Sequence, residues 1–291
     1  MVQAGTPVEL SYDDVRAVNP RIVYASITAF GQHGPYAKQR GYDMLAQAIS
    51  GFMSINGYPD GPPTRAGQSI SDYYAGMLSA FSIVSALRYR DRTGKGQHID
   101  IALLDSMIIA LDNLGERYTI GGEVLTRAGN VAFGGSASGV YATTDGHVAI
   151  AASTSDLVWR RFCKLIGRPE LTTDPDFATV PARRDNQKRV VAIIEQWTRE
   201  RSKADVVKAL SESGVPAAAV NNVAEMVADP QVQAREMFIE HDDPNYGKLR
   251  ITGTPLKLSE TPGRIETLAP LQGQHNEEVF VDMLGHSKDE L

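Results

Sequence analysis

The most regular pattern of apolar and polar positions lies in residues 73–90. Large apolar side chains recur there at the spacing of one face of a helix, at Met77, Phe81, Val84 and Leu87. This spacing predicts a helix from about Tyr73 to Arg90. Asp72, or Ser71 before it, then falls at the N-cap, where a carboxylate accepts bonds from free helix N–H groups and is worth about 1 kcal/mol. A capping role alone is therefore a sufficient explanation of Asp72.

Similar patterns divide the rest of the first half into strands and helices. The β-branched run from Arg21 to Phe30, which ends at Gly31, predicts a buried parallel strand. The run from His98 to Ala102 predicts the next strand. Further helices are predicted over residues 11–18, 42–53 and 103–114.

The second half begins with a hairpin over residues 140–150, predicted to turn at Asp145-Gly146. Capping-box patterns occur at two helix starts, with Ser202 and Asp205 at one and Asn222 and Glu225 at the other. The remaining predicted elements are helices at 156–167, 183–200, 203–213 and 276–284 and strands at 237–241 and 248–251. These patterns predict three parts: residues 1–135, a smaller domain over 140–230, and residues 236–291.

Composition and charge restrict the classes of partner. The 291 residues are 42% hydrophobic, enough for a sizeable core, and carry a net charge of −6, which disfavours nucleic acid and anionic membranes as partners. The single cysteine, Cys163, excludes an internal disulfide, and its neighbours Trp159 and Phe162 predict a buried, inert thiol. Because no apolar run approaches about eighteen residues and no leader pattern is present, we expect a cytoplasmic protein.

Several common kinds of site have no matching motif. No two of the six histidines are spaced i, i+4 and no carboxylates show metal-ligand spacing, so we expect no metal. No G-x-S-x-G element of a serine hydrolase is present. The stretch from Gly134 to Gly139 lacks the strand–helix context of a dinucleotide site and is interpreted by default as a mobile loop. Asp72 is the remaining candidate for chemistry.

Five stretches between Asn19 and Leu104 carry a family resemblance. They read N-P-R-I-V-Y-A-S-I-T-A-F-G-Q-H-G-P-Y, G-Y-D-M-L-A-Q-A-I-S-G, P-D-G-P-P-T-R-A-G, S-D-Y-Y-A-G and A-L-R-Y-R-D-R-T-G-K-G-Q-H-I-D-I-A-L-L. In order and spacing they resemble the class III CoA-transferases, which include formyl-CoA, carnitine and succinyl-CoA:dicarboxylate CoA-transferases. The resemblance continues through S-G-V-P-A-A-A-V-N-N, A-D-P-Q-V-Q-A-R-E-M and A-P-L-Q-G-Q-H-N-E-E-V, and so covers nearly the whole chain.

The resemblance implies an α/β fold, with a Rossmann-like large domain formed from both ends of the chain, a smaller α+β domain between them, and an interlocked homodimer. It also implies that Asp72, in a D-x-x-x-G element that ends at Gly76, is the nucleophile. The carboxylate would attack an acyl-CoA to give a mixed anhydride, then an aspartyl-CoA thioester, from which CoA passes to a small carboxylic acid such as a dicarboxylate. The helix N-terminus would keep this carboxylate ionised.

Two further segments gain expected roles from the resemblance. Arg40, Gly41, Tyr42 and Asp43 match the segment that contacts CoA, with Arg40 as a cation for phosphate or, alternatively, a solvated surface charge. Gly134, Gly135 and Ser136 match a glycine loop that holds water off the intermediate, although a plain domain hinge is the competing interpretation. No tightly bound cofactor is expected, since the CoA thioester is a substrate.

The chain departs from the family pattern in two ways. Related 2-methylacyl-CoA racemases use a histidine where this chain has Tyr42, and a tyrosine is a poor second acid/base, so a transferase is favoured over a racemase. Family members also have a longer N-terminal part, which holds the first strands and much of the CoA site. A catalytically silent fragment that binds CoA or a partner chain therefore stays open as an alternative.

Overall fold

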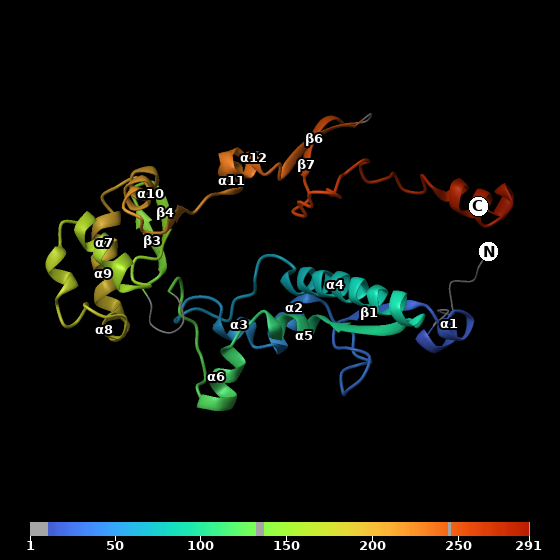
Figure 1. Ribbon diagram of the computed structural model, residues 1–291, viewed down its shortest axis with the longest axis horizontal. Helices are drawn as coiled ribbons and strands as arrows, with labels where there is room; N and C mark the ends of the chain where they lie inside the picture. Colours follow the sequence, from blue (N-terminus) through green and yellow to red (C-terminus); the bar gives the residue numbers. More distant parts are fainter. Residues whose placement is uncertain (1–10, 132–136, 244–245, 291) are drawn as a thin grey trace. The chain divides into compact units, whose positions relative to one another are not determined.

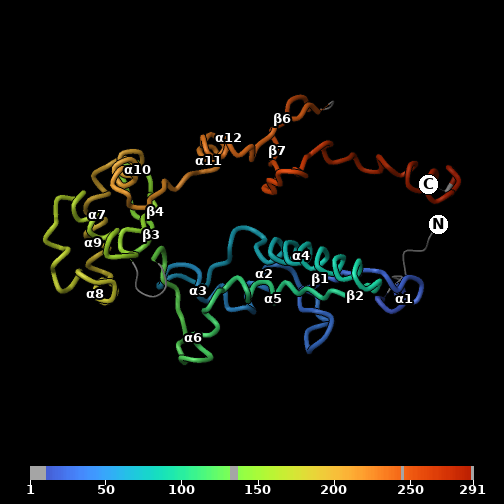
Figure 2. The backbone as a smooth tube through the Cα atoms, viewed as in Figure 1, coloured from blue at the N-terminus to red at the C-terminus, as the bar shows by residue number. Residues whose placement is uncertain are grey.

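The computed structural model describes residues 11–131, 137–243 and 246–290. The chain divides into two compact units, Met1–Ala218 and Ala219–Leu291. Figure 1 labels their helices and strands, and Figure 2 follows the backbone from β1 through α2 and α4 to β2. The division into three parts made from the sequence stays a prediction.

The first unit opens with a helix and a parallel pair of strands. Helix α1 (Tyr12–Val18) starts at a capping box made by Ser11 and Asp14. Strands β1 (Val23–Thr28) and β2 (Gln97–Ala102) pair in parallel over their whole length. Both strands were therefore predicted, and the parallel direction of β1 is confirmed. Its predicted burial is wrong: no residue of β1 is buried, because among the described residues it belongs to a sheet of only two strands.

Helix α4 (Ile70–Thr93) packs against α5, β1 and β2 through small side chains. Its buried residues are Ser71, Ala75, Ser79 and Ala86, whereas Met77, Phe81 and Val84 are exposed. Small residues allow close approach of the neighbouring backbone, so the face that packs within this chain is not the one marked by large apolar residues. The helix itself was predicted, with ends about three residues short.

Two predicted helices are each interrupted. The helix expected over 42–53 is split at Gly51, which has a φ of +88°, into α2 (Asp43–Ile49) and α3 (Phe52–Ile55). The helix expected through 114 ends earlier, as α5 (Leu103–Ile109), and a separate α6 (Leu114–Gly121) follows. Asp112, with a φ of +55°, marks the second break.

The rest of the first unit is a hairpin covered by helices. Strands β3 (Gly139–Thr143) and β4 (Gly146–Ile150) pair antiparallel with Thr143 opposite Gly146, so the turn is at Thr144-Asp145, one residue earlier than predicted. The sheet order is β3-β4-β5. The other elements are α7 (Asp156–Leu165), η1 (Pro169–Thr172), α8 (Val180–Asp185), α9 (Gln187–Thr198), α10 (Lys203–Glu212) and β5 (Ala217–Ala219).

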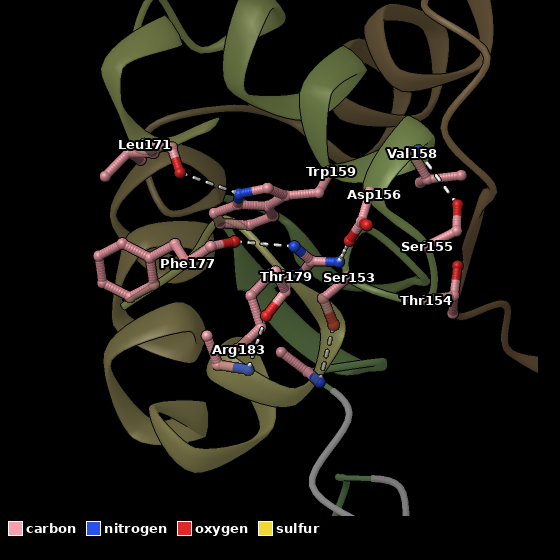
Figure 3. Close-up of polar contacts among 12 residues, drawn as sticks. Ser153, Thr154, Ser155, Asp156, Val158, Trp159, Leu171, Phe177, Thr179 and Arg183 are labelled. Atoms are coloured by element: carbon pink, nitrogen blue, oxygen red, sulfur yellow. Dashed lines mark hydrogen bonds and ion pairs between the residues drawn. The ribbon is translucent and has the colours of Figure 1, made fainter. Parts of the chain in front are cut away.

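A buried arginine sits in the core of this hairpin–helix part (Figure 3). Arg183 donates to Asp156 and to the backbone oxygen of Phe177, both at 2.7 Å, and lies over the Trp159 ring at 5.5 Å. Trp159 and Cys163 are fully buried in the same apolar cluster. The predicted burial of the thiol is confirmed.

The second unit contains a hairpin between short helices. Strands β6 (Phe238–Asp243) and β7 (Gly247–Thr252) lie at about the predicted positions, and they pair antiparallel. Helix α11 (Val223–Ala228) begins at the predicted capping box of Asn222 and Glu225. The remaining elements are α12 (Pro230–Ala234), η2 (Glu277–Met283), a π-helix where an ordinary helix was predicted, and η3 (Lys288–Glu290). Across the described ranges of both units, no helix is both long and apolar enough to cross a bilayer.

Candidate active site

Asp72 is the third residue of α4 and not its cap. The N-cap residue is Ser69 and the helix begins at Ile70, so the N-cap position predicted at Ser71 or Asp72 was wrong. The Asp72 side chain is exposed. Among the described residues, its carboxylate accepts no hydrogen bond. Capping therefore does not account for this carboxylate.

The start of α4 is capped instead by Asp43, the first residue of α2. One carboxylate oxygen of Asp43 accepts the Ser71 N–H at 2.9 Å and the Ser71 hydroxyl at 2.8 Å. Ser69 makes no side-chain bond to the helix start. The first N–H groups of a helix have no partner within the helix. Asp43, from α2, provides a hydrogen-bond acceptor for one of them, the Ser71 N–H.

A buried glutamine extends this network into the segment that leads to α4. Gln47 is fully buried and donates to the other Asp43 oxygen at 2.7 Å and to the Gln68 backbone oxygen at 3.3 Å. Its own side-chain oxygen accepts the Ala66 N–H at 2.8 Å. Two side chains of α2 thus hold residues 66–71 and fix where α4 begins.

The electrostatics at Asp72 oppose ionisation. Partial loss of hydration, and secondly the charge of Asp43, raise the pKa of the Asp72 carboxyl above its ordinary value. This direction is opposite to the one expected from the helix N-terminus.

The segment expected to contact CoA lies beside the start of α4, because Asp43, its last residue, accepts two hydrogen bonds from Ser71 in the first turn of that helix. Gly41 allows the backbone to pass close to β1, since a Cβ at this position would come within 2.5 Å of the Ala29 Cβ. Arg40 and Tyr42 are exposed, Tyr42 by 76%. The structure therefore brings the predicted segment and the predicted nucleophile together.

Gly134, Gly135 and Ser136 lie outside the described residues. The flanking residues on both sides are held by backbone contacts: Val131 bridges to Gly139, and the Val140 N–H donates to the Asn130 oxygen at 3.2 Å. Ala137, the next described residue, donates its N–H to the Ser153 hydroxyl at 2.9 Å, and its backbone oxygen accepts a bond from the Tyr141 hydroxyl.

Arg127 fixes the segment that precedes residue 132. Its guanidinium donates to three backbone oxygens, those of Tyr58 at 3.1 Å, Pro59 at 3.3 Å and Ser54 at 3.4 Å. Asn130 adds a bond to the Tyr58 hydroxyl at 2.8 Å. A cavity of about 340 Å³ opens beside this contact, lined among others by Tyr58, Asn130 and His147. No cluster of ligands suited to a metal ion occurs among the residues that the structure describes.

The structural roles of Asp43, Gln47 and Arg127 were not predicted from the sequence. Asp43 and Gln47 are four residues apart, a spacing that places both on one face of α2 and could have suggested a polar pair. No local pattern marks Ser71 as the partner of Asp43, or the three backbone oxygens as partners of Arg127, because these partners are distant in sequence.

The fold matches solved structures. A CAIB/BAIF family protein from Brucella suis superposes with a TM-score of 0.78 at 36% identity, over 94% of this chain and 71% of that one. The mixed α/β architecture is thus that of the CAIB/BAIF proteins.

Sequence comparison gives the family more directly. The model of CoA-transferase family III matches residues 3–276. The chain belongs to CoA-transferase family III and is an enzyme of the CoA-transferase type. It is 34% identical to a succinyl-CoA–D-citramalate CoA-transferase of Chloroflexus aurantiacus, over 97% of this chain and 70% of that protein. It is 39% identical to a succinate–glutarate CoA-transferase of Agrobacterium fabrum, over 94% of this chain and 68% of that protein.

Proposed function

We propose that this enzyme moves CoA from an acyl-CoA to a dicarboxylic acid through a covalent intermediate on Asp72. The observation that carries the proposal is the free carboxylate of Asp72 on the first turn of α4, whose capping is provided by Asp43. In a CoA-transferase, a carboxylate that is not needed for structure is available to react.

In the first half of the reaction, an Asp72 oxygen attacks the thioester carbonyl carbon. The carbon–sulfur bond breaks, CoA leaves as a thiolate, and a mixed anhydride remains on Asp72. The thiolate then attacks the Asp72 carbonyl carbon and releases the donor acid. CoA is now held as a thioester on Asp72, so one difficult exchange is split into easier steps.

The second half repeats these steps in reverse with the acceptor. An acceptor carboxylate attacks the aspartyl thioester, the thiolate leaves, and it then attacks the acceptor carbonyl carbon, which regenerates Asp72. Dicarboxylic acids are proposed as substrates because the names of the relatives include succinate, glutarate and citramalate.

Arg40, Gly41, Tyr42 and Asp43 are proposed to form the side of the site that contacts CoA. Arg40 offers a cation for a phosphate group, and the exposed Tyr42 ring offers contact area. The Asp43 carboxylate is already bonded to Ser71 and Gln47, so its part is to hold the segment in place. Donation by the backbone N–H groups of Gly134, Gly135 and Ser136 to the reacting oxygen stays a prediction from the sequence.

We propose that the chain forms a Rossmann-like large domain and that two copies form an interlocked homodimer. The parallel pairing of β1 and β2 supports the first. The exposed side chains of Tyr73, Met77, Phe81 and Val84, each more than 60% exposed, support the second, because a stripe of this kind gains stability when a second copy covers it. We also propose a cytoplasmic location, where acyl-CoA is available.

The test is detection of the covalent intermediate. The enzyme is incubated with succinyl-CoA, digested, and analysed by mass spectrometry for CoA mass on the peptide that contains Asp72. We expect the adduct in the unaltered enzyme and none in Asp72→Asn. Asp105→Asn is the matched control, since Asp105 is the exposed third residue of α5. An adduct that survives in Asp72→Asn would refute the proposal.

The same enzyme preparations, given other substrates, separate the alternative functions. Exchange of the α-proton of a 2-methylacyl-CoA without transfer to glutarate would identify a racemase. Absence of both activities, with CoA still bound, would identify a silent CoA-binding chain.

A further inference from the structure

Six described helices carry a carboxylate at the third helical position. In α5 and α6 these are Asp105 and Glu116, and the N-cap residues there make no side-chain capping bond. Three others form such a bond and can be compared with α4. Asp14 in α1 accepts bonds from the backbone and side chain of its N-cap Ser11, at 2.9 and 2.6 Å. Asp205 in α10 accepts from Ser202 at 2.7 Å, and Glu225 in α11 accepts from Asn222 at 2.8 Å. In all three, the carboxylate folds back on the residue that caps the helix.

Helix α4 has the same sequence pattern but a different arrangement. Ser69 and Asp72 are spaced like Ser11 and Asp14, and Ser69 is the N-cap residue. Ser69 nevertheless makes no side-chain bond to the helix, and Asp72 accepts none within the described chain. The local sequence therefore favours a capping box that the folded protein does not form.

In α4, the first turn is bonded to Asp43 instead. Its carboxylate accepts both the N–H and the hydroxyl of the fully buried Ser71, so the first turn of α4 has a charged partner from α2. Hydrogen bonds to an ionised carboxylate are about twice as strong as those between neutral groups. Gln47 holds the second Asp43 oxygen and the Gln68 oxygen, which keeps the chain before the helix from moving into the box geometry.

We propose that Asp43 is a positioning residue for the reaction at Asp72, holding the first turn of α4 so that the Asp72 carboxylate stays clear of Ser69 and faces the acyl-CoA. This inference rests on the proposed function of Asp72. Asp43 itself touches no reacting atom in this scheme. Without it, Asp72 closes the capping box with Ser69, and a misplaced nucleophile loses rate steeply with distance.

The test measures adduct formation on Asp72 in a single turnover at saturating succinyl-CoA. Asp43→Ala is expected to slow this step by about tenfold or more, while Asp43→Glu, which keeps the carboxylate, recovers most of the rate. Ser69→Ala is the control next to the site, since its side chain makes no capping bond, and it keeps the unaltered rate. If Asp43→Ala is poorly folded, Asp43→Asn replaces it, because it keeps one acceptor oxygen without the charge.

Hydrogen exchange of the Ser71 amide gives a readout that does not depend on activity. Faster exchange in the Asp43 variants, together with slower adduct formation and recovery in Asp43→Glu, supports the proposal. An adduct rate in Asp43→Ala or Asp43→Asn equal to that of the unaltered enzyme overturns it. Absence of an adduct in the unaltered enzyme instead refutes the proposed function, and with it any positioning role of Asp43 beyond holding the helix.

Discussion

Gly41 lies so close to Ala29 that a Cβ atom on the glycine would approach the alanine Cβ to 2.5 Å and the Phe30 ring to 2.9 Å. The contact fixes the segment between β1 and α2 against the end of the strand. Gly41 belongs to the segment expected to contact CoA, and the structure places it in a close contact within the chain.

Replacement of Gly41 by alanine should therefore destabilise the protein. Overpacking at a site of this kind costs about 1–3 kcal/mol, to be measured as a loss in the free energy of unfolding in urea. Gly115→Ala in α6 is the control, because a Cβ there meets no atom within 4 Å. Equal stability of the two variants would contradict the steric argument.

Asp72→Asn should be more stable than the unaltered protein at neutral pH. The pKa of Asp72 is raised in the folded state, so the folded protein binds this proton more tightly than the unfolded chain does. The favourable contribution is complete below the unfolded pKa and is lost as pH rises through the folded pKa. Asparagine does not ionise, so Asp72→Asn does not lose this stability as the pH rises.

The difference between the unfolding curves of Asp72→Asn and the unaltered protein should thus grow as the pH is raised from acid to neutral. If this stability difference vanished at neutral pH, or if Asp72→Asn became the less stable protein, the folded state would not raise the pKa of Asp72. Asp105→Asn serves again as the control for the removal of an exposed helical carboxylate.

Gly76→Ala should separate stability from activity. Gly76 lies inside α4, one turn after Asp72, and a Cβ there meets no atom within 4 Å. Alanine in a helix interior is favoured over glycine by about 0.5–1 kcal/mol, so the free energy of unfolding should rise. Because positions i and i+4 share a helix face, the added methyl group occupies space beside Asp72.

We therefore expect Gly76→Ala to form the Asp72 adduct more slowly although it unfolds at higher denaturant concentration. Ala80→Gly, an exposed change one turn further along, should lower stability by a similar amount and leave adduct formation unaltered. Full activity of Gly76→Ala would contradict the idea that the absent side chain of Gly76 leaves space for substrate beside Asp72.

Cys163 should be unreactive in the folded protein. The thiol is fully buried, and burial is the main cause that raises its pKa to about 12. Disulfide reagents at pH 8 should modify it only after denaturation, as absorbance of the released thiolate would record. Ala204→Cys, at an exposed position of α10, is the control and should react at once. Rapid labelling of native Cys163 would indicate that this core opens frequently.

Local patterns were sufficient for much of the fold. The β-branched runs that became β1 and β2 and the periodic segment that became α4 were recognisable because each element's residues are neighbours in sequence. Cys163 was placed correctly in the core for the same reason, since Trp159 and Phe162 lie on the same helix.

Longer-range relations were not recognisable. The N-cap of α4 was misplaced because its capping group is Asp43, 28 residues earlier. The packed face of α4 was also unpredictable, since serine and alanine pack there against α2 and α5 while the larger apolar residues stay exposed. Asp72 itself was identified through resemblance to a family, because a single aspartate before an apolar helix has no chemical signature of its own.

The bond between Asp43 and Ser71 also has a consequence for how the start of α4 forms during folding. It closes a loop of 28 residues, which a flexible chain does only at an entropic cost. A peptide that contains α4 alone would fray at its beginning or adopt the ordinary serine–aspartate cap. During synthesis, the observed arrangement at the start of α4 can therefore form only after two segments distant in sequence have docked.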